Sequence, residues 1–194
     1  MGESDVLWDL GCGDGRILVE AARQVGCRCV GVDIDKACVA DARRLAAEAN
    51  VAHLCTFLTG DALKIAEQGL TNACASPASA FMFDEDSVCP ESLPRPTAIV
   101  LYVTGTMLCA LSGWLRAEWE HLTPAVRIAT CVDALDTAVD YRDDAALFDK
   151  ANPHGWEVSR ADAHARYGIY VVPNRLTSVA EWEEALAPRL DELL

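Results

Sequence analysis

The stretch VLWDLGCGDGR, residues 6–16, decides the fold of this chain. Its apolar start is typical of a buried strand, and the glycines that follow lead through a tight loop into a helix. Glycine permits positive φ angles and lets a ligand lie against bare backbone, while amide N–H groups at the helix start point toward that ligand. The stretch therefore predicts a ligand-binding loop that uses Gly11, Gly13 and Gly15.

The spacing of these glycines argues against a dinucleotide. A dinucleotide-binding loop follows the pattern GxGxxG. Counted from Gly11, the third glycine falls at position 15, and Arg16 stands where that pattern needs glycine. The pattern here is DxGxGxG, and its first residue, Asp9, adds an acid that suits a cationic group. A nicotinamide-dependent oxidoreductase is thus the weaker interpretation.

Predicted strands and helices alternate on the C-terminal side of the loop. Alternation of this kind is typical of a right-handed parallel sheet covered by helices on both faces. The elements that we expect are strands at 6–10, 29–33, 54–58, 98–103 and 126–132, an edge strand at 166–172, and helices at 17–22, 35–49 and 107–121. A final helix is expected after Ser178, which forms a capping box with Glu181.

Residues 69–96 interrupt this alternation. They hold four prolines, two cysteines and an acidic run, with no sustained period. We interpret the segment as a flexible surface insertion rather than a dedicated binding lid. The length of 194 residues fits one well-packed domain, so we expect residues 1–194 to form a single domain that carries this insertion.

Three acids follow three successive predicted strands. Asp9 ends the first, Asp33 ends the second, and Asp61 comes directly after the third. The carboxyl ends of parallel strands form the edge at which open α/β sheets bind ligands. Each acid also has a structural interpretation: Asp9 could stabilise the loop, Asp33 could hold a turn in competition with Asp35, and Asp61 could cap a helix.

S-adenosylmethionine fits this set of acids. It presents an ammonium group, two ribose hydroxyls and an exocyclic amine, all of which donate hydrogen bonds, and it has no phosphate. Each charge-assisted hydrogen bond to a carboxylate contributes about 1.5–3 kcal/mol. We therefore predict S-adenosylmethionine as the cofactor, bound by Asp9, Asp33 and Asp61 together with the three glycines. We predict no metal site.

Charge bears on the partner. The chain carries 30 acidic and 16 basic residues, a net charge of −14. Nucleic-acid binding depends on Lys and Arg that neutralise phosphates, so this balance disfavours a nucleic-acid substrate and favours a basic or lysine-bearing protein.

Nine cysteines are spread through predicted core segments, and their odd number does not suit a disulfide framework. We expect free thiols in an intracellular reducing compartment, cytoplasmic or mitochondrial. No apolar run approaches the ~20 residues of a membrane span, and we recognise no signal peptide before the first predicted strand.

Residues 5–132 resemble class I methyltransferases, through VLWDLGCGDGR, the following VGVDID and the later TGDA. The strings DLGCGDGRI, GVDID and IVLYVTGTMLCAL are similar to those of small lysine methyltransferases that act on the ATP synthase c-subunit and the adenine nucleotide translocase. The resemblance implies a doubly wound, mostly parallel seven-stranded sheet whose last strand is antiparallel, a place that residues 166–172 suit. The insertion at 69–96 departs from that subgroup.

Tyr102 ends the fourth predicted strand in the sequence YVTGT. Enzymes that methylate adenine or glutamine nitrogens carry an NPPY-like tetrapeptide there, and its absence argues against both activities. Tyr102 either lines the channel for the acceptor, which would make it the candidate catalytic residue, or packs in the sheet. No histidine has a partner that its spacing identifies.

We therefore expect methyl transfer from S-adenosylmethionine, with a protein lysine amine as the leading acceptor. The alternatives are a small-molecule or RNA methyltransferase and a catalytically silent protein that binds S-adenosylmethionine.

Overall fold

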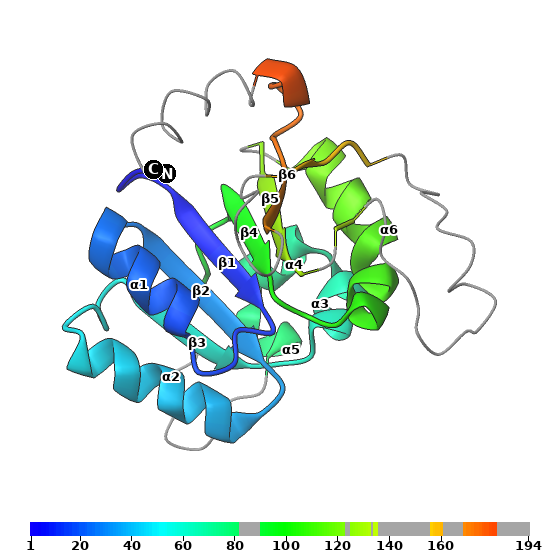
Figure 1. The fold of residues 1–194 in the computed structure, drawn as a ribbon. Coiled ribbons are helices and arrows are strands. Elements are labelled where there is room, and N and C mark those ends of the chain that lie inside the picture. The colour runs from blue at the N-terminus through cyan, green and yellow to red at the C-terminus, as the bar shows by residue number, and fades with distance from the viewer. Residues whose placement is uncertain (82–89, 123–124, 133, 136–155, 161–168, 182–194) are drawn as a thin grey trace. The chain divides into compact units, whose positions relative to one another are not determined.

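The computed structural model describes residues 1–81, 90–122, 125–132, 134–135, 156–160 and 169–181 (Figure 1). The chain divides into two compact units, Met1–Tyr102 and Val103–Leu194. All of the predicted site residues belong to the first unit.

The first unit is built on four parallel strands. They are β1 (Val6–Leu10), β2 (Arg28–Asp33), β3 (Cys55–Thr59) and β4 (Ala98–Leu101), in the order β3-β2-β1-β4. Every residue of β1 and β4 is buried, as expected for parallel strands that are covered on both faces. The four predicted strands of this part of the chain are thus confirmed, with ends that differ by at most two residues.

Helices connect these strands. They are α1 (Arg16–Val25), α2 (Lys36–Glu48), α3 (Ala62–Gln68), α4 (Leu70–Ala75) and α5 (Pro77–Ala80). The sheet grows in one direction from β1 to β3 and then reverses to β4. Because crossovers between parallel strands are right-handed, α1 and α2 cover one face and α3 to α5 cover the other, an arrangement that can be followed in Figure 1. This is the doubly wound arrangement that was predicted.

The segment 69–96 has more regular structure than the sequence suggested. Its first part forms α4 and α5, and Leu70 and Cys74 are buried. Its last part returns along the core, where the Trp8 indole Nε1–H donates to the Pro94 carbonyl oxygen at 2.9 Å. Helices of six and four residues are too short to produce a recognisable period in the sequence. Residues 82–89 lie outside the described part.

The second unit contains α6 (Gly105–His121) and the strands β5 (Arg127–Cys131), β6 (Ser159–Arg160) and β7 (Ile169–Val172). The predicted helix at 107–121 is confirmed. It begins two residues earlier because Thr104 caps it, with the hydroxyl accepting from the Met107 amide at 3.3 Å. The capping box is also confirmed: the Ser178 amide donates to Glu181 at 2.8 Å, and the Glu181 amide donates to the Ser178 hydroxyl at 3.2 Å.

Strand β7 is antiparallel, as predicted, but it is not an edge strand. It pairs with β5 on one side and with β6 on the other. The edge assignment was wrong because β6 has only two residues, too few for a periodic pattern in the sequence. Residues 161–168 lie outside the described part, so β7 is seen from Ile169 onward. Six of the described strands have four residues or more, whereas β6 has only two. The predicted count of seven regular strands therefore stays a prediction.

The architecture is therefore α/β, with parallel strands β1 to β4 and antiparallel pairing among the last strands. Among the described residues, none of the helices combines the length and the apolar character that a membrane crossing requires.

Candidate functional site

The glycine loop lies at the carboxyl end of β1. Gly11, Gly13 and Gly15 have φ angles of 92°, 54° and 73°, in the left-handed region that side chains disfavour. The Gly11 and Cys12 amides both donate to the Val32 carbonyl oxygen, at 2.8 and 3.0 Å, so the loop is tied to the end of β2. A Cβ built on Gly13 would meet no atom within 4 Å. The backbone at Gly13 is therefore open to a ligand.

Gly15 serves packing. A Cβ on Gly15 would lie 2.7 Å from Cε1 of Phe57, and one on Gly31 would lie 2.6 Å from Cδ1 of the same ring. The Phe57 side chain of β3 thus packs against the backbone of Gly15, at the start of α1, and of Gly31 in β2. Gly15 was predicted from the sequence to contact the ligand, and Gly31 was not predicted, although a glycine inside a strand is a known sign of close backbone approach.

Asp9 is a buried acid in β1. Its side chain is 1% exposed, and Oδ1 has no hydrogen-bond partner among the described residues. Burial raises the pKa of Asp9, the nearby charge of Asp33 raises it as well, and together they bring it to about 7. A carboxylate without a partner in the protein interior is costly, so this oxygen is available to a donor or a cation from a ligand. Among the described residues, Asp9 Oδ1 makes no hydrogen bond that would stabilise the glycine loop.

The pKa of Asp9 leads to a pH dependence of stability. The folded state holds the Asp9 proton up to about pH 7, whereas the unfolded chain releases it near 3.8. The folded state binds more protons between these values, so the free energy of unfolding falls as the pH rises through this window. We expect the stability of the wild type relative to Asp9→Asn to fall by roughly 1.4 kcal/mol per pH unit at most. Urea unfolding of both proteins at several pH values measures this difference. If the free energies of unfolding of the wild type and of Asp9→Asn change in parallel with pH, the prediction is contradicted.

Asp33 holds two backbone amides at the end of β2. Its Oδ2 accepts from the Gly13 amide at 2.8 Å, and its Oδ1 accepts from the Asp35 amide at 2.9 Å. Each carboxylate oxygen can accept more than one hydrogen bond, so Asp33 positions the loop and keeps acceptor capacity toward a ligand. Asp35 caps α2 instead, with Oδ1 accepting from the Ala37 amide at 2.8 Å.

Asp61 caps α3. Its Oδ1 accepts from the Leu63 amide at 2.9 Å, which is the structural interpretation weighed for this residue. The turn before it is tied to β2, because the Gly60 amide donates to the Asp33 carbonyl oxygen at 2.9 Å. Asp9, Asp33 and Asp61 therefore lie at the carboxyl ends of three neighbouring parallel strands, as predicted from their spacing.

Exposed apolar side chains accompany these acids. Ile34 follows Asp33 and is 65% exposed, and Leu63 lies two residues after Asp61 and is 40% exposed. Tyr102, directly after β4, is 54% exposed, so it does not pack inside the sheet. Ile34 and Leu63 were not predicted from the sequence, although each is an apolar residue within two positions of an acid at the end of a strand.

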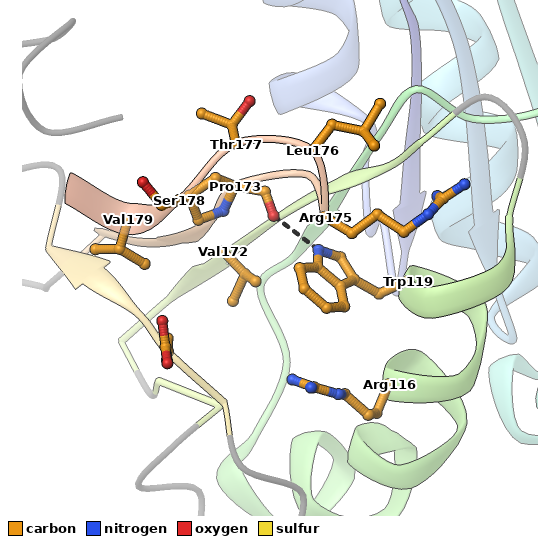
Figure 2. A pocket seen from close by; sticks show the side chains of 10 residues that line it. Arg116, Trp119, Val172, Pro173, Arg175, Leu176, Thr177, Ser178 and Val179 are labelled. Atoms are coloured by element: carbon orange, nitrogen blue, oxygen red, sulfur yellow. Dashed lines mark hydrogen bonds between the residues drawn. The ribbon is translucent and has the colours of Figure 1, made fainter. Parts of the chain in front are cut away.

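A separate cavity of ≈320 Å³ lies within the second unit, between α6, β7 and the segment that follows β7 (Figure 2). The Trp119 indole Nε1–H donates to the Pro173 carbonyl oxygen at 2.7 Å, and the Arg116 guanidinium lies 4.8 Å from the centre of the Trp119 ring. None of the predicted site residues lines this cavity. Because Val172 pairs with Ile128 near the start of β5, the cavity lies away from the carboxyl end of that strand.

Within the residues that the structure describes, no group of three or more His, Cys, Asp or Glu side chains is arranged to hold a metal ion.

Residues 7–88 match a family model described as a methyltransferase domain. Among solved structures, the chain is similar to an RNA methyltransferase from Salinibacter ruber in complex with S-adenosyl-L-homocysteine. The two share 25% identity, with a TM-score of 0.57, and the match covers 91% of this chain and 89% of that one. The protein is an S-adenosylmethionine-dependent methyltransferase. No curated protein sequence matches it.

Two further structures are less similar to this methyltransferase. A SAM-dependent methyltransferase from Geobacter sulfurreducens shares 21% identity, with a TM-score of 0.45, and is covered over 43% of its length by 68% of this chain. A geranyl diphosphate C-methyltransferase from Streptomyces coelicolor A3(2) also shares 21% identity, with a TM-score of 0.45, and is covered over 39% of its length by 67% of this chain. Neither bears on the acceptor of this methyltransferase.

The match to the family model covers the glycine loop and the three acids of this methyltransferase. It ends at residue 88, before Tyr102.

Proposed function

We propose that this methyltransferase binds S-adenosylmethionine at the carboxyl ends of β1, β2 and β3 and transfers its methyl group to a lysine amine of a protein. The observation that carries the proposal is the buried Asp9 carboxylate, whose Oδ1 has no hydrogen-bond partner among the described residues. It belongs to the strand that leads into the open backbone at Gly13.

The residues fit the donors of S-adenosylmethionine. Asp9 would take the ammonium group, Asp33 the ribose hydroxyls, and the free acceptor capacity of Asp61 the exocyclic amine. Ile34 and Leu63, which are exposed beside two of these acids, offer apolar surface for the base. When bound, S-adenosylmethionine supplies a sulfonium methyl group with a good leaving group.

The protein's part in the reaction is alignment and exclusion of water. Methyl transfer is a displacement in which the acceptor amine attacks the methyl carbon and the sulfur leaves. Holding the reacting groups close to contact lowers the free-energy barrier of this displacement by about 7–11 kcal/mol. The amine must be neutral to react, and a desolvated channel beside a positive sulfonium depresses the pKa of a lysine amine. We propose Tyr102, exposed after β4, as the residue that contacts this amine. No further general base is required once the amine has lost its proton.

Charge favours a lysine-bearing protein. The net charge of −14 attracts a basic partner and repels a phosphate backbone. The second candidate, an RNA methyltransferase, is favoured by the likeness to the Salinibacter ruber protein, which extends over 91% of this chain. The first candidate predicts that the methyl group is transferred to protein, and the second predicts that it is transferred to RNA.

A radiolabelled methyl assay separates them. The full chain is incubated with labelled S-adenosylmethionine and a cell extract, and the products are divided into protein, RNA and small-molecule fractions. We expect label in protein, recovered as methyllysine after acid hydrolysis and insensitive to ribonuclease.

The Asp33→Ala variant is the control, because it should lose labelling in every fraction. Label in RNA would establish the second candidate, and label only in small molecules would contradict both. Binding of S-adenosylhomocysteine without labelling of any fraction would identify a silent binding protein.

A further inference from the structure

Three cysteines meet at the amino-terminal ends of β2 and β3. Cys27 and Cys29 are buried, and their Sγ atoms lie 3.9 Å apart. Cys29 and Cys55 are register partners on the neighbouring parallel strands, so their side chains leave the sheet on the same face. The Cys29 thiol also lies 3.4 Å from the Leu18 carbonyl oxygen of α1, which places the cluster under that helix.

Cys55 is the accessible member of the cluster. It is half-buried, whereas Cys29 is 1% exposed. The neighbouring Cys29 thiol lowers the pKa of Cys55, and the pKa of Cys29 is raised in turn. Elsewhere in the first unit, burial raises the pKa of both Cys12 and Cys38. A thiolate is the form of cysteine that reacts with an oxidant, so reactivity concentrates at Cys55.

We propose that Cys55 and Cys29 form a peroxide-reactive pair, in which oxidation at Cys55 is resolved by Cys29 into a disulfide that joins β2 and β3. The Cα atoms of neighbouring strands are about 4.7–4.9 Å apart, within the range of about 4.4–6.8 Å that disulfides span.

The reaction balances in two steps. The Cys55 thiolate attacks one oxygen of hydrogen peroxide, the O–O bond breaks, hydroxide leaves, and Cys55 becomes a sulfenic acid. The sulfur of Cys29 then attacks the sulfenic sulfur, the S–O bond breaks, and the hydroxyl group leaves as water with the Cys29 proton. Two thiols lose two electrons, and one peroxide is reduced to two waters.

The position of the pair separates it from methyl transfer. Cys29 and Cys55 stand at the opposite ends of β2 and β3 from Asp33 and Asp61. We expect the oxidised protein to bind S-adenosylhomocysteine with an affinity close to that of the reduced protein. The proposal does not depend on the proposed acceptor.

Digestion with trypsin places each cysteine of the cluster in a separate peptide. Cleavage after Arg28 and Lys36 isolates Cys29 in peptide 29–36, and cleavage after Arg44 and Lys64 isolates Cys55 in peptide 45–64. Cys27 falls in the separate peptide 24–28. The reduced, full-length protein is treated with hydrogen peroxide, blocked with an alkylating reagent, and digested without reductant. We expect peptides 29–36 and 45–64 joined, two hydrogens lighter than their sum, and separated again by dithiothreitol.

Variants test the roles. Cys55→Ser should abolish the joined peptide, and Cys29→Ala should leave a sulfenic acid at Cys55 that dimedone labels. Cys109→Ser, which removes an exposed thiol, is the control and should leave the joined peptide unchanged. Melting temperatures of the reduced variants show that each is folded.

A joined pair of peptides 24–28 and 29–36, or oxidation at Cys109 with Cys55 unmodified, would overturn the proposal. So would dimedone labelling of Cys55 that is equal in the wild type and in Cys29→Ala.

Discussion

Asp33→Ala is expected to weaken binding of S-adenosylhomocysteine by about 100-fold or more, because two charge-assisted hydrogen bonds of about 1.5–3 kcal/mol each are lost. The same carboxylate accepts the amides of Gly13 and Asp35, so the variant also loosens the loop that faces the cofactor. Isothermal titration calorimetry measures the affinity, and circular dichroism establishes that the variant is folded.

Asp35→Ala is the matched control for this prediction. Asp35 lies two residues away and caps α2 through the Ala37 amide. Its removal should cost about 1 kcal/mol of stability, as the loss of a helix cap does, and leave the affinity close to that of the wild type. If the Asp35 variant loses as much affinity as the Asp33 variant, the assignment of the ribose contact to Asp33 is wrong.

Gly15→Ala is expected to destabilise the fold by roughly 2–5 kcal/mol, the sum of left-handed strain and overpacking. The new methyl group would lie 2.7 Å from Phe57 and 2.8 Å from Ala42, and both neighbours belong to packed elements. The φ angle of 73° adds strain whatever space is available. Thermal and urea unfolding measure the change, which should appear as a lower transition midpoint in the absence of ligand.

Gly13→Ala separates folding from binding. This position also has a positive φ angle, of 54°, but its added Cβ meets no atom within 4 Å. We expect a loss of stability of only about 1 kcal/mol from strain, together with a large loss of affinity for S-adenosylhomocysteine, because the methyl group occupies the open side of the loop. Equal destabilisation by the two substitutions would show that the loop is not open at Gly13.

The predicted site depended on order along the chain more than on any single residue. The sequence alone places Asp9, Asp33 and Asp61 on one edge, since successive parallel strands end at the same edge of a sheet. The role of each acid could not be deduced in that way. That Asp61 caps α3 and that Oδ1 of Asp9 has no partner depend on side-chain directions, which sequence spacing does not specify.

Long-range packing explains the other differences. The helices α4 and α5 became visible only through the burial of Leu70 and Cys74, and β7 lost its edge position because a two-residue strand pairs with it. The close approach of Phe57 to Gly15 and Gly31 joins residues far apart in the chain. A pattern within a short window carries no information on such neighbours.

The amino-acid sequence by itself determined the alternation of strands and helices, the left-handed glycine loop, and the position of three acids at the ends of successive strands, because periodicity and backbone freedom are local properties. Only the tertiary structure decided that Asp9 is buried with a raised pKa, that Ile34 and Leu63 are exposed beside the acids, and that Cys29 is the register partner of Cys55. These are properties of surroundings, and the surroundings of a residue are assembled from segments that the chain brings together only when it folds.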